Sequence, residues 1–417
     1  MSKPRIFLSA GEASGDHYGA QVIEALRASL PDATFFGLGG REMECAGLDR
    51  VVRAEDVAHM GITEVIRHMP RVYGSYRRLV GSIKTRRPDA AVLIDFPDVN
   101  LRLARELKAL NIPVVYFVSP QLWAWKRRRL RWVQERVDRM MVIFPFEEAF
   151  YRARGVDATF VGHPLIELPL PDISCEDYAA RHSLDAARPW VALLPGSRRK
   201  EIRSNLPTML DAAARLSPDG GIEFLLPVAS TLETAWVREQ TARWTTPQDG
   251  KTTPALLNLH LVGDARDALF HAQASVVASG TATVQAAVIG NPFLVVYRVS
   301  SLTFAAAKAL IRYPAEIPAE PDTNGNLPIG MVNLIAGRRI VPELIQQQFT
   351  ADNVVVELRR LLDDTSERSQ MIADLSEVRS RLLPPARSGA IAQVAEAVMS
   401  QLSPNQPAVG LKSVPSV

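Results

Sequence analysis

Acidic side chains follow two apolar runs in the first half of the chain. Glu12 comes just after the run at residues 5–10, and Asp95 ends the run at residues 90–95. A carboxylate at the end of a strand can take the proton from an alcohol, as a general base does. The loop around Glu12, "SAGEASGD", lacks both the G-x-G-x-x-G fingerprint and the Lys-Ser/Thr of a Walker loop. It therefore indicates binding of hydroxyl groups, as in a sugar, or of a cation. The simpler alternative is an ordinary turn in which Asp16 caps the following helix.

Hydroxyl groups, glycines and an arginine follow the apolar runs of the second half. Ser197 and Arg198 come after "WVALLPG", and the stretch "SGTATVQAA" supplies Ser279, Gly280 and Thr281. That stretch opens a predicted helix, whose free N–H groups and dipole favour an anion. Arg198 can add a charge-assisted hydrogen bond. This half therefore suits a diphosphate. An acceptor alcohol in one half and a nucleotide-activated donor in the other indicate a glycosyltransferase.

Short apolar runs must position these side chains. They are continuous rather than alternating, which is typical of parallel strands covered on both faces. Helical segments lie between them. The runs of the first half are residues 5–10, 34–39, 90–95, 114–119, 139–144 and 159–164, and those of the second half begin at residues 190, 222, 258, 274 and 292. We therefore predict two doubly wound α/β domains, each with its ligands at the carboxyl ends of parallel strands.

A proline-rich segment at residues 162–177 separates the two sets of strands. The predicted division is a first domain at residues 1–165, a second at residues 166–350, closing helices at residues 351–402 and a disordered tail at residues 403–417. Facing each other, the two domains would form a cleft lined by the ends of their strands.

The composition narrows the class of protein. The chain has 417 residues, 47% of them hydrophobic and 22% charged, which is ordinary for a soluble globular protein. A net charge of +3 gives no general basic field for nucleic acid. Two cysteines, Cys45 and Cys175, form neither a disulfide framework nor a metal set, which fits a reducing cytoplasm. The N-terminus leads straight into a strand, so we expect no signal peptide, and no apolar run reaches the roughly 18 residues of a spanning helix.

Nine motifs taken together resemble the lipid-A-disaccharide synthase family. They run in that family's order from about residue 9 to about residue 347: "AGEASGD", "MGITEV", "IDFPDVN", "YFVSPQLWAW", "FPFE", "FVGHPL", "LLPGSR", "ASGTAT" and "NLIAGRRIVPELIQ". The resemblance implies the GT-B glycosyltransferase fold. It also implies inverting transfer of 2,3-diacylglucosamine from UDP-2,3-diacylglucosamine to 2,3-diacylglucosamine 1-phosphate, which gives the lipid A disaccharide 1-phosphate and UDP.

The resemblance assigns roles at matching positions. Asp95 would be the general base on the acceptor hydroxyl, Glu12 would contact the acceptor or position Asp95, and Arg198 would neutralise the departing UDP. The alternative for Asp95 is a turn acid that caps the helix near Asn100. The remaining implied contacts are Ser197, Ser279, Gly280, Thr281, Gln285 and Asn333 to UDP, and Ser14, Asp98, Asn100 and Trp123 to the acceptor. Asp98 has capping or orienting as its alternative role. No metal and no cofactor is implied, and His163 is interpreted as a turn residue.

The chain departs from the family pattern in two places. Gln285 stands where the family's "SGTATLE" has glutamate, a carboxylate that would accept hydrogen bonds from the ribose. The segment at residues 313–332 is longer than usual and rich in proline, with Val332 directly before Asn333. We expect both to affect how the nucleotide is bound.

Two segments suggest contact with a membrane. Residues 59–80 mix apolar and basic side chains at helical spacing, as interfacial helices do. Residues 123–132 combine tryptophans with Lys126 and four arginines, which suits anionic headgroups or the 1-phosphate of the acceptor. A solvated helix face is the alternative for the basic cluster, and one short run makes nucleic acid a poor partner. We therefore expect a cytoplasmic protein, peripheral on the inner-membrane surface, and the resemblance allows a homodimer.

Other functions remain open at this stage. Another GT-B enzyme acting on a UDP-sugar, such as an N-acetylglucosaminyltransferase or a UDP-sugar epimerase, would share the two-domain fold but not "SPQLWAW" or "AGEASGD". A non-catalytic member would bind UDP-sugar or lipid without turnover. A Rossmann dehydrogenase is excluded because the G-x-G-x-x-G fingerprint is missing.

Overall fold

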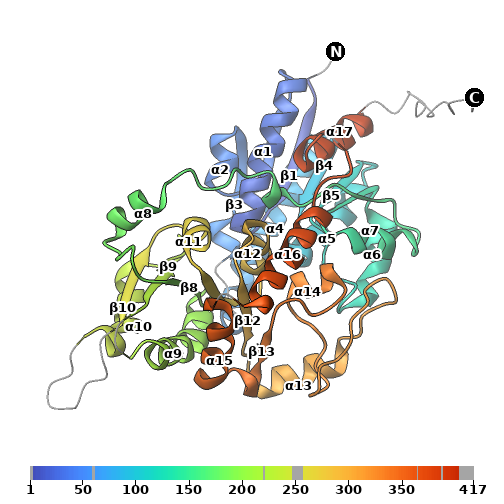
Figure 1. The fold of residues 1–417 in the computed structure, drawn as a ribbon. Helices are drawn as coiled ribbons and strands as arrows, with labels where there is room; N and C mark the ends of the chain where they lie inside the picture. Colours follow the sequence, from blue (N-terminus) through green and yellow to red (C-terminus); the bar gives the residue numbers. More distant parts are fainter. Residues whose placement is uncertain are drawn as a thin grey trace, which may run out of the picture. The chain divides into compact units, whose positions relative to one another are not determined.

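A computed structural model describes residues 3–58, 62–218, 221–246, 257–363, 365–386 and 388–402. The predicted tail at residues 403–417 lies outside these residues, as do residues 59–61 and the side chains of residues 62–71 in the predicted interfacial segment. The chain divides into two compact units (Figure 1). Unit 1 comprises Met1–Pro164 and the segment from Pro384 onward, and unit 2 comprises Leu165–Leu383.

Unit 1 is built on a parallel sheet. Among its described residues the strands are β1 (Arg5–Ala10), β2 (Thr34–Gly39), β3 (Leu48–Arg53), β4 (Ala90–Ile94), β5 (Val114–Phe117), β6 (Arg139–Val142) and β7 (Ala158–Phe160). Their order across the sheet is β3-β2-β1-β4-β5-β6-β7. The helices are α1 (Ala13–Ser29), α2 (Arg41–Cys45), α3 (Glu55–Ala58), α4 (Ile62–Arg86), α5 (Pro97–Lys108), α6 (Leu130–Arg136), α7 (Pro145–Arg152) and α17 (Ala390–Leu402), with 3-10 turns η1 (Arg127–Arg129) and η2 (Pro164–Ile166).

Unit 2 repeats this plan. Its described strands are β8 (Trp190–Leu194), β9 (Glu223–Pro227), β10 (Asn258–Val262), β11 (Ala274–Ala278), β12 (Phe293–Tyr297) and β13 (Glu343–Ile345), in the order β10-β9-β8-β11-β12-β13. The helices are α8 (Cys175–His182), α9 (Arg199–Leu216), α10 (Thr234–Thr245), α11 (Ala265–His271), α12 (Thr281–Ile289), α13 (Ser301–Leu310), α14 (Met331–Ala336), α15 (Ala351–Leu362) and α16 (Ser366–Arg381), with a 3-10 turn η3 (Gln346–Gln348).

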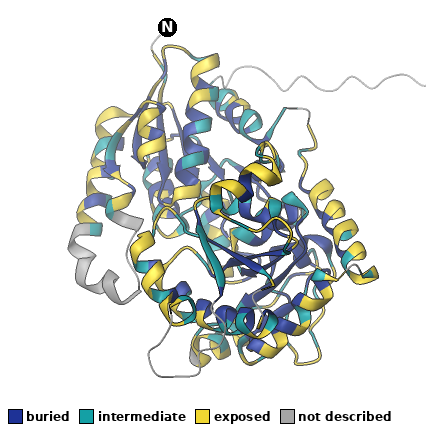
Figure 2. Cartoon of the chain, turned by 60° about the vertical axis from the view of Figure 1, so that its left-hand side comes forward, coloured by how far each residue is buried: buried dark blue, intermediate teal, exposed yellow. Residues whose placement is uncertain are grey.

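The central strands are buried along their whole length because helices cover both faces of each sheet. Every residue of β4, β8 and β11 is buried, and β1 is buried except for its first residue. Figure 2 shows these strands in dark blue, with helices whose outer sides are yellow. Continuous apolar runs such as "AAVLI" therefore encode parallel strands, as predicted. The doubly wound α/β class is confirmed.

Each sheet has one point at which the strand order reverses. In unit 1 it lies between β1 and β4, which pair in parallel with Ala10 opposite Ile94. In unit 2 it lies between β8 and β11. Neighbouring connections leave in opposite directions at such a point, so a crevice opens at the carboxyl ends of the two strands. The loops that begin at Gly11, Asp95, Pro195 and Ser279 lie at these two points.

Two strands, β3 and β13, were not predicted. β3 carries exposed charges and β13 has only three residues, so neither gives a long apolar run.

The C-terminal helices are divided between the units. α15 and α16 belong to unit 2, whereas α17 belongs to unit 1, where it packs against α1, β4 and β5. Gln393 of α17 donates from Nε2 to the carbonyl oxygen of Val161 over 3.1 Å.

Candidate active site

Two carboxylates meet at the switch point of unit 1. Glu12 directly precedes α1, and Asp95 directly follows β4. Burial, and then the negative charge of Glu12, raise the pKa of Asp95 to about 6, against the opposing effect of the Phe96 N–H. A carboxyl group whose pKa lies near the working pH is a more effective general base than an ordinary aspartate. The predicted pair is therefore brought together, in a form suited to proton removal.

The backbone at Asp95 is strained and firmly held. Asp95 and Phe96 have φ values of 45° and 47°, a left-handed region that non-glycine residues seldom occupy. The Asp95 N–H donates to the Phe117 carbonyl over 2.9 Å, and its carbonyl accepts from the Tyr116 hydroxyl over 2.6 Å. The Phe96 ring packs on Gly11, where a Cβ atom would come within 2.4 Å of it. Strain of this kind persists where the surroundings over-determine the conformation, often at functional sites.

Asn100 lies beneath the site rather than in it. Its side chain is fully buried, and its Nδ2 donates to the carbonyls of Ser9, Ile94 and Asp95 over 3.2, 3.1 and 2.7 Å. The Ser9 hydroxyl donates to Asn100 Oδ1 over 2.6 Å. Asn100 thus ties β1 to β4 and holds the Asp95 carbonyl. Its side-chain hydrogen bonds are thus made within unit 1, and the acceptor contact that the resemblance implied stays a prediction.

The other predicted acceptor residues differ in exposure. Ser14 is exposed in the first turn of α1. Asp98 is exposed and pairs with Arg129 and, over 3.9 Å, with Lys126. Trp123 is only 2% exposed, so its ring is enclosed in unit 1.

The aromatic surface beside the basic cluster comes instead from Trp125. This ring is 50% exposed, and the Lys126 Nζ lies 4.1 Å from its centroid. Both tryptophans belong to "LWAW", and the sequence gives no signal for which of them faces solvent.

Asp16, the second acid of the first loop, does cap a helix, but not its own. Its carboxylate accepts from the N–H groups of Gly40, Glu42 and Met43 over 2.7, 3.0 and 3.1 Å. These groups are at the start of α2. The two acids of "GEASGD" therefore have separate tasks, since Asp16 is structural and Glu12 faces Asp95.

The start of α12 is open at the switch point of unit 2. Gly280 precedes the helix with a φ of 155°, and a Cβ atom there would meet nothing within 4 Å. No side chain among the described residues caps this helix. The Thr283 hydroxyl turns inward and donates to the Gly280 carbonyl over 2.8 Å. The first turn of α12 can therefore donate its N–H groups to an anion, close to Ser279 and Thr281.

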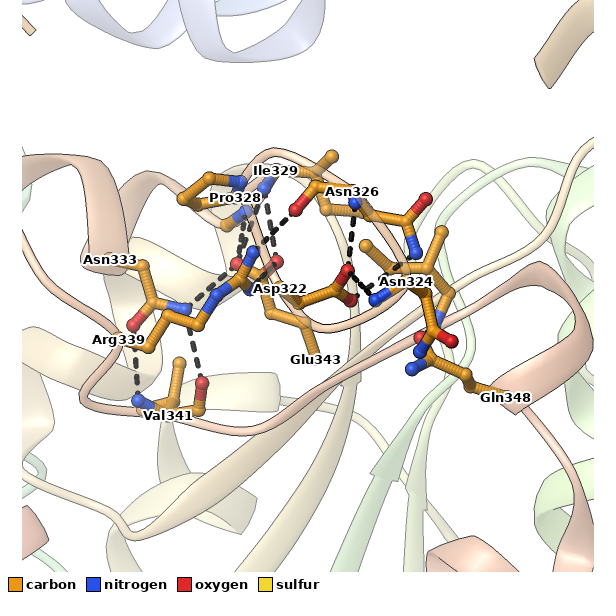
Figure 3. Close-up of polar contacts among 12 residues, drawn as sticks. Asp322, Asn324, Asn326, Pro328, Ile329, Asn333, Arg339, Val341, Glu343 and Gln348 are labelled. Atoms are coloured by element: carbon orange, nitrogen blue, oxygen red, sulfur yellow. Dashed lines mark hydrogen bonds and ion pairs between the residues drawn. The ribbon is translucent and has the colours of Figure 1, made fainter. Parts of the chain in front are cut away.

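Two other helices of unit 2 start on a carboxylate of the chain itself. Glu201 accepts from the N–H groups of Ser197 and Arg198 over 3.0 and 3.3 Å at the start of α9. Glu343 accepts from the N–H of Gly330 over 2.9 Å at the start of α14, and from the Ile329 N–H over 3.1 Å (Figure 3). These positions are already satisfied by negative charge. Of these three helix starts, α12 is thus the one suited to an added diphosphate.

The predicted nucleotide residues outside the α12 loop have different environments. Arg198 is exposed, with its Nη1 atom 3.8 Å from Glu201 Oε1, so it can turn toward a ligand. Gln285 is half-buried one helical turn beyond Thr281, and its side chain makes no hydrogen bond among the described residues.

Asn333 is enclosed rather than presented to a nucleotide. It is 1% exposed, and its Oδ1 accepts from Ile340 N–H and Val341 N–H over 2.8 and 3.0 Å. Its Nδ2 donates to the Val341 carbonyl and to Glu343 Oε1 over 3.0 and 2.8 Å. Figure 3 shows this side chain closing the turn between α14 and β13. Its hydrogen-bonding positions are used within unit 2.

The proline-rich segment at residues 313–332 is folded against the same cluster. Asp322 accepts from the N–H groups of Asn324 and Asn326 over 2.9 and 2.7 Å. Arg339 donates to the Asn326 carbonyl over 2.7 Å and to Glu343 over 3.0 Å (Figure 3). The insertion is therefore tied to the buried Glu343 and, through it, to Asn333.

No group of three or more histidine, cysteine, aspartate or glutamate side chains is placed to hold a metal ion within the described ranges. Cys45 and Cys175 are both free thiols. A search of the same residues finds no helix with the length and apolar character needed to span a membrane.

Comparison with known sequences identifies the family. The sequence model of lipid-A-disaccharide synthetase matches residues 6–398. The lipid-A-disaccharide synthase of Acidobacterium capsulatum is 55% identical over 404 residues, covering 96% of this chain and 97% of that protein. The enzyme of the same name from Koribacter versatilis is 48% identical over 379 residues, covering 91% and 93%.

Comparison with solved structures identifies the fold. The calicheamicin glycosyltransferase CalG4 superposes with a TM-score of 0.59 at 15% identity, covering 98% of this chain and 100% of that one. MnaA of S. aureus, solved with UDP, superposes with a TM-score of 0.59 at 12% identity, covering 96% of both chains. At such identities the likeness shows the fold alone, and the predicted GT-B type is confirmed.

Proposed function

This chain belongs to the lipid-A-disaccharide synthetase family and is a glycosyltransferase, and we propose that it joins UDP-2,3-diacylglucosamine to 2,3-diacylglucosamine 1-phosphate. The products are the β-1,6-linked disaccharide 1-phosphate and UDP. The observation that carries this proposal is the half-buried Asp95 carboxylate, whose pKa is raised by burial and by Glu12 at the switch point of unit 1.

Asp95 acts as the general base in this proposal. Inversion requires that the acceptor hydroxyl loses its proton as it attacks the anomeric carbon from the face opposite UDP. The carboxylate of Asp95 takes that proton, and Glu12 keeps the pKa of Asp95 raised while contacting the acceptor sugar. Asn100, Tyr116 and Phe117 fix the backbone of the base, so its carboxylate needs little reorganisation.

The donor diphosphate binds at the start of α12. Its oxygens accept from the N–H groups after Gly280 and from the hydroxyls of Ser279 and Thr281, where no side chain of the described residues caps the helix. Arg198 neutralises the charge that develops on UDP as the glycosidic bond breaks, which is typically a large catalytic contribution. Gln285 contacts the ribose through a neutral amide in place of a carboxylate.

The exposed part of the basic cluster binds the lipid phosphate or the membrane surface. Trp125 is half exposed beside Lys126, and the neighbouring Arg127 and Arg128 are exposed. An aromatic ring with several cations suits an anionic interface. We therefore place the enzyme on the cytoplasmic face of the inner membrane as a peripheral protein. A homodimer is the further expectation, which sedimentation of the purified protein tests.

Product analysis with the purified protein tests the function. Incubation with both lipid substrates should release UDP and form the disaccharide 1-phosphate in equal amounts. A UDP-sugar epimerase would alter the donor without the acceptor. A non-catalytic member would bind UDP in a titration but form neither product, and that outcome would refute the proposal.

A further inference from the structure

A buried carboxylate lies beneath the loop that follows β5. Glu147 is 1% exposed and is the third residue of α7. Its Oε2 accepts from the Phe144 N–H over 3.2 Å and so caps the helix. Its Oε1 accepts from the Ser119 hydroxyl over 2.7 Å and from the Trp123 indole N–H over 3.0 Å. Capping the helix requires only Oε2, whereas Oε1 binds the loop.

The loop held by Glu147 starts with a strained residue. Val118 has a φ of 61°, a left-handed conformation that is exceptional for a β-branched side chain. Its N–H donates to the Met141 carbonyl over 3.1 Å. One turn after Glu147, the Tyr151 hydroxyl donates to the Pro120 carbonyl over 2.8 Å. Helix α7 thus holds residues 118–123 through two side chains and makes the strained path of the chain possible.

Residues on both sides of this loop contact the segment that carries Asp95. On the strand side, Tyr116 and Phe117 bind the Asp95 backbone. On the far side, Lys126 and Arg129 pair with Asp98, three residues beyond Asp95. A shift of residues 118–126 would therefore move the surroundings of the Asp95 carboxylate.

We propose that Glu147 is a positioning residue for glycosyl transfer, which fixes residues 118–126 and, through them, the segment that carries Asp95. The inference rests on the proposed function, because Asp95 must be the base for the effect to appear in turnover. Burial raises the pKa of Glu147 to about 7, partly offset by the hydrogen bonds from Ser119 and Trp123. An enclosed carboxylate with all its partners supplied rigidifies what it binds.

Two conservative loop variants and one helix variant test this role. Trp123→Phe removes the indole N–H but keeps a buried ring, Ser119→Ala removes the hydroxyl, and Glu147→Gln replaces the acceptor carboxylate. Glu148→Gln is the matched control, because Glu148 is the next residue of α7 and pairs only with Arg152 among the described side chains. The measurements are kcat, the acceptor KM, the UDP Kd by calorimetry, and the melting temperature.

We expect kcat to fall about tenfold in Glu147→Gln and Trp123→Phe, within the range for a displaced catalytic group. The UDP Kd should stay unchanged, since the nucleotide binds unit 2, and Glu148→Gln should behave as wild type. The double variant of Glu147→Gln and Trp123→Phe should lose little more kcat than either single variant. Wild-type kcat in both Trp123→Phe and Ser119→Ala would overturn the proposal, even if Glu147→Gln fails to fold. Failure of the proposed function looks different, because wild-type protein would then release no UDP.

Discussion

The switch points of the two sheets occupy equivalent places but hold their polar groups in opposite ways. In unit 1, Asp95 is half-buried near Glu12, and its backbone is hydrogen-bonded by residues of β5 and α5. In unit 2, the start of α12 is left without a capping side chain at Gly280. A site for proton removal needs a carboxylate kept partly from water, whereas a site for an anion needs donors that the protein has not used. One fold plan therefore supports two kinds of chemistry.

The largest effect should come from the base. Asp95→Asn keeps the shape of the side chain but cannot accept a proton, so turnover should fall by roughly 10²–10⁴-fold. UDP affinity should be retained because the α12 loop is untouched. Turnover measured from UDP release, together with calorimetric UDP binding, separates the two effects. Near-normal turnover would remove Asp95 from the mechanism.

A smaller effect is expected from substitution of Arg198 in unit 2. Arg198→Ala should lower both UDP affinity and turnover by about tenfold, since one charge-assisted contact is lost from an exposed position. Arg199→Ala is the matched control, because the Arg199 guanidinium lies over the Trp236 ring. If UDP binding in calorimetry is the same for Arg198→Ala and the control, Arg198 does not contact the diphosphate.

Substitution of Gln285 should raise UDP affinity several-fold, the opposite of the effect at Arg198. Gln285→Glu restores a charged acceptor for the ribose hydroxyls, worth about 1 kcal/mol, so UDP should bind several-fold more tightly. Unaltered UDP affinity would show that this side chain does not touch the ribose. Restoration of turnover to an inactive parent would instead favour the non-catalytic interpretation.

The smallest effect concerns pH. Because Asp95 must be ionised to act, kcat/KM should fall as the pH drops through about 6. Glu12→Gln removes the second-largest cause of the raised pKa of Asp95, so the acid limb should move to lower pH, with burial maintaining part of the elevation. The measurement is the pH at which kcat/KM falls to half its maximum, which does not depend on the size of that maximum. An unmoved limb, or one moved to higher pH, would contradict the assigned coupling.

The sequence predicted the sheets well because a buried parallel strand is an unbroken apolar run, as in β4 and β11. It also placed Glu12, Asp95 and the α12 loop at the carboxyl ends of strands, since these come directly after such runs. It could not tell that Asn100, Trp123 and Asn333 are enclosed, because burial of a polar side chain depends on partners distant in sequence, such as Ser9 for Asn100.

The three carboxylates that organise the loops had only weak local signals. Glu147 and Glu201 each stand at the third position of a helix, a spacing typical of a capping box. Glu343 follows its helix by several residues, and no spacing rule links it to Gly330. Capping can be read from such spacing, but the additional bonds from Ser119 and Trp123 to Glu147 arise only in the folded unit.

The placement of α17 has a consequence for the order in which the protein can fold during synthesis. Unit 1 begins with the first strand but is completed by Ala390–Leu402, which pack on α1, β4 and β5. Unit 2 is continuous and can fold as soon as it has been made. Unit 1 therefore keeps an uncovered apolar face on the ribosome until almost the whole chain has emerged. Premature termination near residue 383 should thus yield a protein with an intact unit 2 and an aggregation-prone unit 1.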